Sequence, residues 1–325
     1  MIVVTGAAGF IGSNVVAALN ARGRSDIVVV DSFRDASKAR PYLDTLQIRA
    51  RLDKDDLGRW LGDEGRGVEA IIHEGACTDT TVSDRATVMA LNTDYTRMLW
   101  QWCTRAGKPL VYASSAATYG DGSRGYDDEA DPRALTPLNL YGESKQLFDC
   151  WALQQTDTPP RWAGLKYFNV YGPHEAHKGR MASVVFHAYH QIRETGKVKL
   201  FKSHKDGYPD GGQQRDFVYV NDAVEATLHL LQAPVSAKAP NGVYNVGTGQ
   251  ARTFADLGQA VFAALGREPD IEYIPMPVDL RERYQYFTQA KVDKLRRSGF
   301  TRPFRPLEEG VQAYVGYLQA EESNG

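Results

Sequence analysis

A glycine-rich turn between a buried strand and a helix is the feature of this sequence that most restricts its fold. The motif reads Thr-Gly-Ala-Ala-Gly-Phe-Ile-Gly, and its glycines Gly6, Gly9 and Gly12 follow the spacing G-x-x-G-x-x-G. It comes directly after the apolar run Ile2–Thr5 and before an Ala/Val/Leu-rich stretch, 13–22, which predicts a helix. Small residues let the backbone approach a pyrophosphate, and the N-terminus of the helix then faces the phosphates. The alternative is a tight turn that binds nothing.

Further apolar runs recur along the first half of the chain, separated by helical stretches. They share an absence of polar–apolar alternation and lie at 27–30, 70–73, 109–112 and 163–168. Such runs are typical of strands covered on both faces, hence of a parallel sheet with crossover helices. We therefore predict an α/β fold with a Rossmann-type doubly wound parallel sheet.

The rhythm changes after about Val170, where Tyr-Gly-Pro breaks the pattern. We expect residues 1–172 to form the dinucleotide-binding domain, with later segments at about 215–247 and 285–293 returning to it. Residues 173–325 would form most of a smaller, interleaved α/β substrate-binding domain. Its expected elements are a loop at 174–180, a helix at 182–194, a loop at 203–214 and strands at 215–220 and 244–247.

Composition limits the kinds of partner. The 325 residues include 38 Lys+Arg and 40 Asp+Glu, a formal net charge of −2, which argues against a nucleic-acid surface. No apolar run approaches the roughly 18 residues that span a bilayer, and the chain opens on a strand rather than a signal peptide. Three cysteines, Cys77, Cys103 and Cys150, form neither a disulfide framework nor a metal motif. We expect a cytoplasmic protein with no membrane, nucleic-acid or metal partner.

An acidic residue ends the second apolar run. Asp31 lies 19 residues after Gly12, near the spacing of the carboxylate that binds the cofactor ribose. By itself it favours NAD, because a carboxylate repels the 2′-phosphate of NADP. Ser32, Arg34 and Lys38 follow and could bind that phosphate or lie in a solvated loop. The residues alone leave NAD and NADP open.

Three features further along indicate hydride-transfer chemistry. Ser115 closes the run Tyr-Ala-Ser-Ser at the end of the fourth strand, Tyr141 and Lys145 open a helix, and Asn169 follows the fifth strand. Tyr141 and Lys145 share one helical face at the i, i+4 spacing. A lysine ammonium favours the phenolate of a neighbouring tyrosine, which is otherwise a weak base with a pKa near 10. Ser115 can hydrogen-bond the reacting oxygen; the alternative is an idle, solvated Tyr/Lys pair.

Together, the motifs TGAAGFIG, ASSAATYG, YGESK and FNVYG resemble the extended short-chain dehydrogenase/reductases that act on nucleotide-diphosphate sugars. Within them, the sequence most resembles the ADP-L-glycero-D-manno-heptose 6-epimerases, and the resemblance covers essentially the whole chain. The segments that carry it are HEGACTDTT (73–81), YASSAATYG (112–120), YFNVYGP (167–173), HKGRMASVVFH (177–187), RDFVYV (215–220), NVGTG (245–249), RYQYFTQA (283–290) and LRRSGF (295–300).

The resemblance implies a homo-oligomeric isomerase with one tightly bound NADP per subunit. It would convert ADP-D-glycero-β-D-manno-heptose to the L-glycero epimer at C6″ by transient oxidation and reduction, and supply heptose for the lipopolysaccharide core. Tyr141 and Lys178 would be opposed acid/bases, supported by Lys145 and Ser115. From spacing alone, Lys178 would be a surface lysine of the loop 174–180, so this assignment depends on the resemblance.

The resemblance and the glycine turn also give two sets of expected binding residues. The cofactor set is Gly6, Gly9, Phe10, Ile11, Gly12, Asp31, Ser32, Lys38, Lys54, Glu74, Gly75, Ala76, Cys77, Thr78, Asn92, Lys145, Val170 and Lys178. The substrate set is Ser115, Asn169, Arg180, His187, Phe201, Arg215 and Tyr284.

Several of these residues have alternative interpretations. The Arg215 guanidinium suits a diphosphate but could pair with Asp216, and His187 could be a core histidine. Some family members carry serine where Arg180 stands, so that contact is expected to differ. The loop 203–214 is longer than in the shortest members, which leaves its first residues unassigned as substrate contacts.

Three other functions fit parts of the sequence. A nucleotide-sugar dehydratase typically carries an Asp-Glu pair just after the strand-end serine, where this chain has Ala116 and Ala117, which cannot transfer a proton. A 4-epimerase needs only the tyrosine, lysine and serine, but does not call for the HKGRMAS segment. An NADP-sensing module without turnover would not need the intact catalytic residues.

Overall fold

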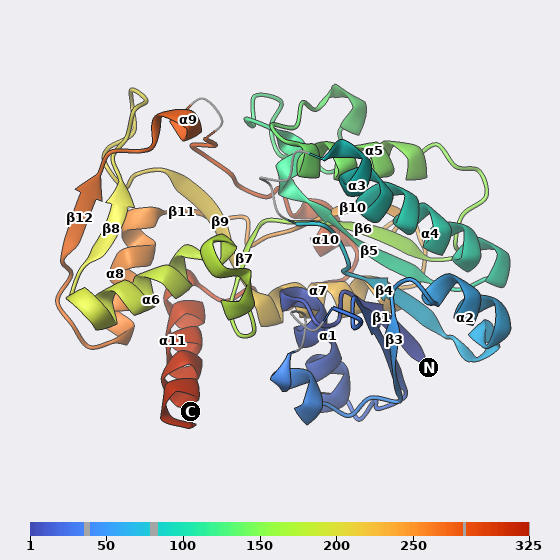
Figure 1. Ribbon diagram of the computed structural model, residues 1–325. Coiled ribbons are helices and arrows are strands. Elements are labelled where there is room, and N and C mark those ends of the chain that lie inside the picture. The colour runs from blue at the N-terminus through green and yellow to red at the C-terminus, as the bar shows by residue number, and fades with distance from the viewer. Residues whose placement is uncertain (36–39, 79–83, 282–283, 325) are drawn as a thin grey trace.

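A seven-stranded parallel sheet forms the centre of the computed structural model, which describes residues 1–35, 40–78, 84–281 and 284–324 (Figure 1). The predicted Rossmann-type doubly wound sheet is thereby confirmed. From one edge to the other, its strands are β10 (Gly242–Val246), β6 (Trp162–Tyr167), β5 (Leu110–Ser115), β4 (Ala70–His73), β1 (Ile2–Thr5), β2 (Ile27–Asp31) and β3 (Ala50–Asp53).

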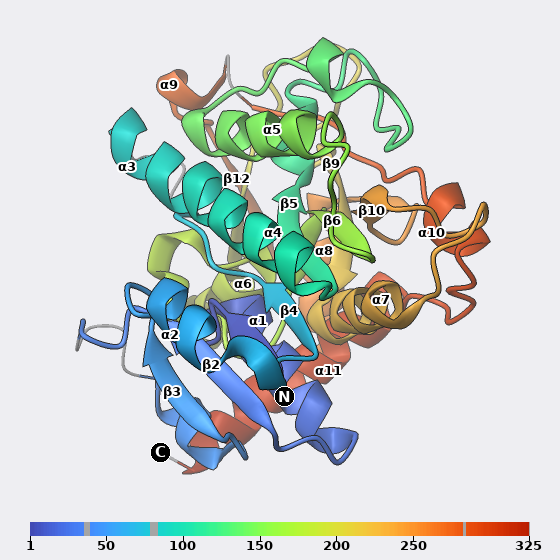
Figure 2. The same ribbon diagram turned by 90° about the vertical axis from the view of Figure 1, so that its right-hand side faces the viewer.

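Successive side chains of the central strands enter two different hydrophobic cores. On β1, Ile2 and Val4 belong to one core and Val3 to the other, and all three are buried. Both faces are therefore covered, as strands without alternation require. Helices α1 (Phe10–Ala21), α7 (Val220–Gln232) and α10 (Asp293–Arg297) cover the first face. Helices α2 (Leu57–Asp63), α4 (Tyr95–Ala106) and α5 (Leu140–Ala152) cover the second, and Figure 2 shows α4 and α5 running across it.

A second group of elements packs beside the central sheet and has its own core. That core contains Tyr171, Tyr189, Phe262 and Tyr314, and the group lies on the left in Figure 1. Its strands are β7 (Asn169–Tyr171), β9 (Gln214–Tyr219) and β11 (Ala251–Thr253) in one sheet, and β8 (Val198–Phe201) and β12 (Ile271–Ile274) in another. Its helices are α6 (Val184–Thr195), α8 (Phe254–Ala264), α9 (Val278–Arg281) and α11 (Leu307–Asn324).

The edge strand β3 and two element boundaries differ from the sequence prediction. β3 was not predicted, because its sequence Ala-Arg-Leu-Asp lies half-exposed at the sheet edge and has no apolar run. Helix α1 begins at Phe10 rather than at residue 13, because its N-cap is Gly9. Helix α6 begins at Val184 rather than at residue 182, because its N-cap is Ser183.

The order in which successive strands are added to the sheet changes direction at β1. The chain runs from β1 to β2 and β3 on one side, then crosses to β4, β5 and β6 on the other. In such sheets the crevice at the carboxyl ends of the strands, next to the reversal, is where ligands bind. The ends of β1, β2, β4 and β5 are therefore the place to look for a site.

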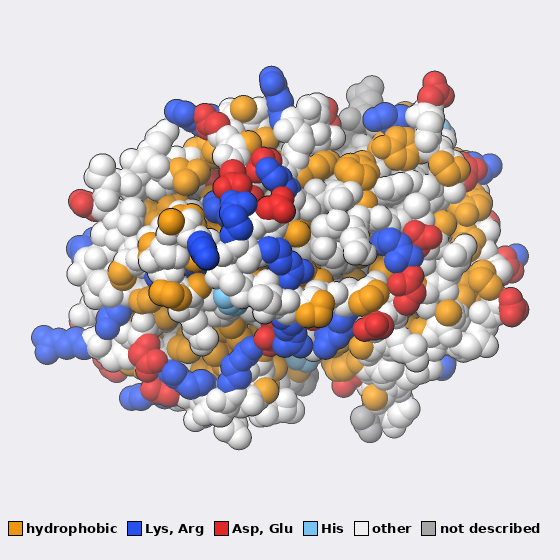
Figure 3. Space-filling view, turned by 180° about the vertical axis from the view of Figure 1, so that it is seen from behind, with side chains coloured by type: hydrophobic (Ala, Val, Ile, Leu, Met, Phe, Trp, Pro, Cys, Tyr) orange, Lys and Arg blue, Asp and Glu red, His pale blue; other side chains and the backbone are white. Residues whose placement is uncertain are grey.

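Charges on the surface are mixed. On the face drawn in Figure 3, Lys and Arg side chains are interspersed with Asp and Glu side chains. Arg22 and Arg302, for example, both pair with Glu225, at 2.6 and 3.0 Å. Within the described ranges, no helix is long and apolar enough to cross a bilayer, and no three His, Cys, Asp or Glu side chains are grouped to hold a metal ion.

Candidate active site

The glycine turn after β1 has a backbone that side chains would disrupt. Gly6 adopts a left-handed φ of +65°, and a Cβ there would lie 2.5 Å from the Gly75 nitrogen. A Cβ on Gly12 would lie 2.2 Å from the Gly6 oxygen, so the turn and the first turn of α1 touch directly. Among the described residues, no side chain caps α1 at Gly9. The N–H groups and positive dipole end of this helix are thus presented to an anion.

Asp31, the last residue of β2, lies beside this turn. Its carboxylate accepts hydrogen bonds from the Ala8 nitrogen at 2.9 Å and the Ser32 nitrogen at 2.8 Å. The Lys54 nitrogen donates to the Asp31 carbonyl at 2.9 Å, while the Lys54 ammonium pairs with Asp55 at 2.6 Å. The structure thus brings Asp31, Ser32 and Lys54 to the glycine turn. Lys38, predicted for the same site, lies outside the described residues.

The segment Glu74–Thr78 follows β4 and is held by a buried asparagine. Asn92 accepts a hydrogen bond from the Cys77 nitrogen at 2.7 Å and donates to the Cys77 oxygen at 3.0 Å. It also donates to the Ser144 hydroxyl of α5 at 2.9 Å. Asn92 lies in a short π-helical turn, Ala90–Asp94, which joins α3 (Arg85–Met89) to α4. π-Helical turns are frequent at functional sites, and this one ties the segment after β4 to α5.

Ser115, Tyr141 and Lys145 meet at the end of β5. Asn139 caps α5 by accepting a hydrogen bond from the Gly142 nitrogen at 2.8 Å, which places Tyr141 in the first helical turn. Burial and the charge of Glu74 raise the pKa of Tyr141, whereas a hydrogen bond with Ser115 lowers that pKa. The Lys145 ammonium donates to the Ala113 oxygen of β5 at 2.7 Å. Burial lowers the pKa of Lys145 to about 8, opposed by the charges of Glu74 and Asp149.

Asp149 is a member of this cluster that the sequence analysis missed. It follows Lys145 by four residues, so Tyr141, Lys145 and Asp149 share one face of α5. Its carboxylate accepts hydrogen bonds from Ser114 at 2.7 Å and Tyr112 at 3.0 Å, which fixes α5 to β5. Extending the i, i+4 spacing by one step would have found it.

Glu74 is a half-buried acid whose charge acts on the same lysine. One of its oxygens accepts a hydrogen bond from the Tyr167 hydroxyl at 2.9 Å, and the other is buried and has no partner among the described residues. Burial raises the pKa of Glu74 to about 7, opposed by the Tyr167 hydrogen bond and the charge of Lys145. An unpartnered buried oxygen of this kind is suited to a ligand group.

Lys178 lies against the glycine turn rather than in solvent. Its ammonium is 5.3 Å from the centre of the Phe10 ring, at the start of α1. Burial lowers the pKa of Lys178, opposed by the charge of Glu175. Lys178 is thus half-buried and not fully exposed, and its role as an acid/base stays a prediction.

The loop that carries Lys178 is anchored at both ends. Glu175 is fully buried and accepts hydrogen bonds from the Gly172 nitrogen at 3.1 Å and the Ser183 nitrogen at 2.6 Å. His174, a non-glycine residue with φ of 71°, stacks on Tyr42 with ring centres 4.2 Å apart. The Tyr42 hydroxyl donates to the Ala8 oxygen of the glycine turn at 2.6 Å. No local sequence pattern indicates these anchors, because their partners are far apart in the chain.

Arg215 is a buried cation surrounded by aromatic rings. Its guanidinium is 5.1 Å from the centre of the Tyr284 ring and 5.6 Å from that of Phe254. The Tyr284 ring in turn meets Phe201 edge-on, with centres 6.3 Å apart. The structure thus brings together three predicted substrate residues, Phe201, Arg215 and Tyr284.

The alternative partner of Arg215, the neighbouring Asp216, is engaged elsewhere. Its carboxylate accepts hydrogen bonds from the nitrogens of Thr248 at 2.7 Å, Gly249 at 2.9 Å and Ala290 at 3.0 Å. None of the ion pairs formed by the described residues joins Arg215 to a carboxylate. Among the described residues, this buried guanidinium contacts ring faces and one backbone oxygen, so it is suited to bind an anion.

The remaining predicted substrate residues lie around this region. Asn169 begins β7 and accepts a hydrogen bond from the Thr288 hydroxyl at 3.5 Å. Val170 follows it and packs against the central core. His187 is half-buried on α6, with its ring 5.7 Å from that of Phe186. Arg180 is exposed, in the 3-10 turn Ala176–Met181 that also carries Lys178.

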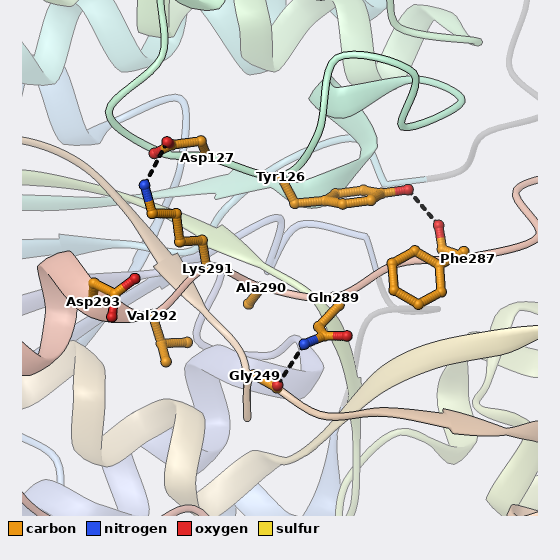
Figure 4. A pocket seen from close by; sticks show the side chains of 9 residues that line it. All are labelled: Tyr126, Asp127, Gly249, Phe287, Gln289, Ala290, Lys291, Val292 and Asp293. Carbon is orange, nitrogen blue, oxygen red and sulfur yellow. Dashed lines mark hydrogen bonds and ion pairs between the residues drawn. The ribbon is translucent and has the colours of Figure 1, made fainter.

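A cavity of about 420 Å³ lies beside Tyr126 and Phe287 (Figure 4). Gln289 and Lys291 line it, and Lys291 pairs with Asp127 at 2.7 Å. Its lining contains no residue that the sequence analysis expected to bind cofactor or substrate. The cavity therefore does not mark the catalytic cluster, which is identified by its chemistry instead.

Known proteins resemble this chain along its whole length. The pattern of the NAD dependent epimerase/dehydratase family matches residues 2–247. A Fusobacterium nucleatum protein named ADP-L-glycero-D-manno-heptose-6-epimerase is 48% identical over 340 residues, covering 99% of each chain. The crystal structure of the Helicobacter pylori ADP-L-glycero-D-manno-heptose-6-epimerase has a TM-score of 0.83 at 29% identity, covering 98% of this chain and 96% of that one.

A second solved structure comes from another branch of nucleotide-sugar enzymes. The Thermus thermophilus UDP-glucose 4-epimerase, in complex with NAD, has a TM-score of 0.76 at 26% identity and covers 98% of both chains. The identity to the Fusobacterium protein is far higher. The chain therefore belongs to the NAD dependent epimerase/dehydratase family and, within it, to the family of the ADP-L-glycero-D-manno-heptose-6-epimerases.

Proposed function

We propose that this chain is an isomerase that converts ADP-D-glycero-β-D-manno-heptose to ADP-L-glycero-β-D-manno-heptose at C6″ and so supplies heptose for the lipopolysaccharide core. The names of its relatives support this substrate. The observation that carries the mechanism is the position of Lys178 against Phe10 of the glycine turn, because inversion at one carbon needs an acid/base on each side. Tyr141 is the first acid/base and Lys178 the second.

The residues around the glycine turn fit a nicotinamide dinucleotide. Gly12 packs so closely on Gly6 that a Cβ would clash there, and this tight turn lets the backbone and the N-terminus of α1 approach a pyrophosphate. Asp31 at the end of β2 is placed for a ribose hydroxyl, and the unpartnered oxygen of Glu74 is available to a further polar group. When bound, the nicotinamide ring supplies hydride acceptance and return.

We propose NADP as the dinucleotide, as the family resemblance implies. Two backbone N–H groups bind the Asp31 carboxylate, which offsets part of its repulsion of a 2′-phosphate. Arg34 pairs with Asp56 at 2.6 Å, so the cation for this phosphate would be Lys38. Extraction of the dinucleotide from purified protein, followed by mass determination, tests NADP against NAD.

The chain's own residues move the protons. Tyr141 takes the proton of the C6″ hydroxyl while hydride leaves C6″, giving a ketone, and Ser115 hydrogen-bonds the ketone oxygen. The Lys145 ammonium favours the Tyr141 phenolate. After the ketone presents its other face, hydride returns to C6″ and Lys178 donates the proton to the oxygen. Arg215 holds the diphosphate through its planar guanidinium.

Incubation with the D-glycero substrate and no added dinucleotide tests this function. Nuclear magnetic resonance should show the L-glycero epimer accumulating to equilibrium, and the reverse reaction should start from the product. Conversion of UDP-galactose without conversion of the ADP-heptose would contradict the proposal and favour a 4-epimerase. We also propose a cytoplasmic homo-oligomer, which light scattering on the purified protein tests for subunit number.

A further inference from the structure

The loop between β8 and β9 is folded onto the aromatic residues beside Arg215. His204 donates its backbone N–H to the Tyr286 hydroxyl at 2.9 Å, and the Tyr208 ring lies 5.1 Å from the Tyr286 ring. The base of the loop is closed by a hydrogen bond from the Ser203 nitrogen to Asp210 at 2.8 Å. It is the loop 203–214, whose first residues the sequence analysis left unassigned as substrate contacts.

Lys205 at the tip of this loop has no carboxylate within salt-bridge distance among the described residues. Its ammonium instead lies 5.5 Å from the centre of the Tyr286 ring and 5.8 Å from that of Tyr208. Its side chain is largely exposed. A cation held over ring faces, rather than by a carboxylate, remains available to an anionic ligand.

The aromatic rings connect Lys205 to Arg215 in a continuous wall. The ring centres of Tyr286 and Tyr284 are 5.6 Å apart. The Arg215 guanidinium lies 5.1 Å from the centre of the Tyr284 ring. Burial lowers the pKa of Arg215, opposed by the hydroxyls of Tyr284, Tyr126 and Tyr208. Tyr208 is therefore within electrostatic range of the buried cation.

The charge of Lys205 also acts on a carboxylate in the segment that follows the central strand β5. Hydrogen bonds from Ser123 lower the pKa of Asp121, and the charge of Lys205 lowers it further. Asp121 lies just after the turn that follows β5, and Gln285 donates to the Gly120 oxygen next to it. Lys205 is thus within electrostatic range of Asp121, in the segment that follows β5.

We propose that Lys205, positioned by Tyr208 and Tyr286, is a second, outer cation of the substrate site and binds the diphosphate of the nucleoside-diphosphate sugar. Arg215 would bind it from the buried side and Lys205 from the solvent side. A diphosphate carries more negative charge than one guanidinium offsets, so a second cation at the mouth completes its neutralisation. This inference rests on the proposed function, because it assigns the ligand of the same site.

Titration calorimetry on the protein as purified, with its dinucleotide, tests the proposal with ADP, UDP and adenosine as probes. Lys205→Met should weaken ADP binding about 3- to 10-fold and leave adenosine unchanged, because the lost contact is to phosphate. Lys205→Arg should restore most of the affinity. Lys199→Met is the matched control, since Lys199 is exposed on the neighbouring strand β8 and should leave ADP binding unchanged.

Each outcome bears on the proposal. ADP binding within twofold of wild type in Lys205→Met, or equal weakening of ADP and adenosine, would overturn it, as would wild-type protein that binds neither ADP nor UDP. If wild type fails to convert the ADP-heptose but Lys205→Met weakens UDP binding, the proposed substrate is wrong and the role of Lys205 stands. If wild type converts the ADP-heptose and Lys205→Met binds ADP normally, only the role of Lys205 fails.

Discussion

The proposed dinucleotide side and the proposed substrate side of the molecule would bind anionic groups in different ways. On the dinucleotide side, the glycine turn presents backbone N–H groups at the N-terminus of α1, and the contact of Gly12 with Gly6 fixes their position. On the substrate side, the buried Arg215 lies between the rings of Tyr284 and Phe254. One side therefore depends on backbone geometry and the other on side-chain packing. A net charge of −2 is compatible with two diphosphates because neither arrangement needs a large excess of cations.

The two sides meet where Tyr141 and Lys178 are proposed to exchange protons with C6″, and changes there should have the largest effect. Tyr141→Phe and Lys178→Met should each lower kcat about 10²–10⁴-fold, since each removes an acid/base. Steady-state conversion of the ADP-heptose measures this. Tyr273→Phe on β12 and Lys199→Met on β8 are the matched controls and should keep normal rates. A near-normal rate in Lys178→Met would remove the second acid/base from the mechanism.

Gly12→Ala probes the backbone-built side alone. Its new Cβ would lie 2.2 Å from the Gly6 oxygen, so the turn must shift. We expect a loss of about 2 kcal/mol in the free energy of unfolding, with a sharp fall in the dinucleotide that copurifies. Denaturant titration and absorbance of the extracted dinucleotide measure the two effects.

Gly62→Ala is the control for this change. Gly62 lies in α2, and a Cβ there meets nothing within 4 Å, so alanine should stabilise the protein by about 0.5–1 kcal/mol. Unchanged dinucleotide content in Gly12→Ala would show that the turn tolerates a shift. The contrast between the two sides would then be weaker than the geometry indicates.

The effect of Glu74→Gln on the free energy of unfolding depends on pH and is smallest in acid. Burial raises the Glu74 pKa from 4.5 to about 7, so between these values the folded protein binds more protons than the unfolded chain. Stability contributed by this group therefore falls as pH rises through that window, and the full penalty is present above pH 7. The variant lacks the carboxylate, so its gain in the free energy of unfolding over wild type should grow from nothing near pH 4.5 to about 3 kcal/mol at pH 8.

Thermal or denaturant unfolding at several pH values, with matched dinucleotide content, measures this difference. Glu64→Gln is the control, because Glu64 is exposed and the substitution should leave the pH dependence unchanged. A pH-independent difference between Glu74→Gln and wild type would mean that Glu74 does not titrate in this range. Its oxygen would then be stabilised by a partner other than a proton.

The same contrast explains what the sequence could predict. The glycine turn, Asp31, Ser115 and the Tyr141/Lys145 pair follow local spacings along single elements, so the fold and the position of these residues were predictable. Arg215, Tyr286 and Tyr208 come together only because β9, the segment after α9 and the β8–β9 loop fold against one another. Such contacts between distant segments leave no periodic pattern. The strand β3 was missed for a related reason, because an exposed edge needs no apolar run.

The segment from Tyr284 to Val292 forms hydrogen bonds with both sides of the cleft. Thr288 and Gln289 bond to Gln214 and Gly249 at 3.2 and 2.9 Å, and Lys291 bonds to the Tyr126 oxygen at 3.3 Å. Each such bond contributes about 1 kcal/mol, so swinging the two halves apart would break several at once. This segment therefore restrains the separation of the two halves. In the proposed mechanism, the ketone would therefore turn over between two halves held at a constant separation, with the nucleotide end bound in place.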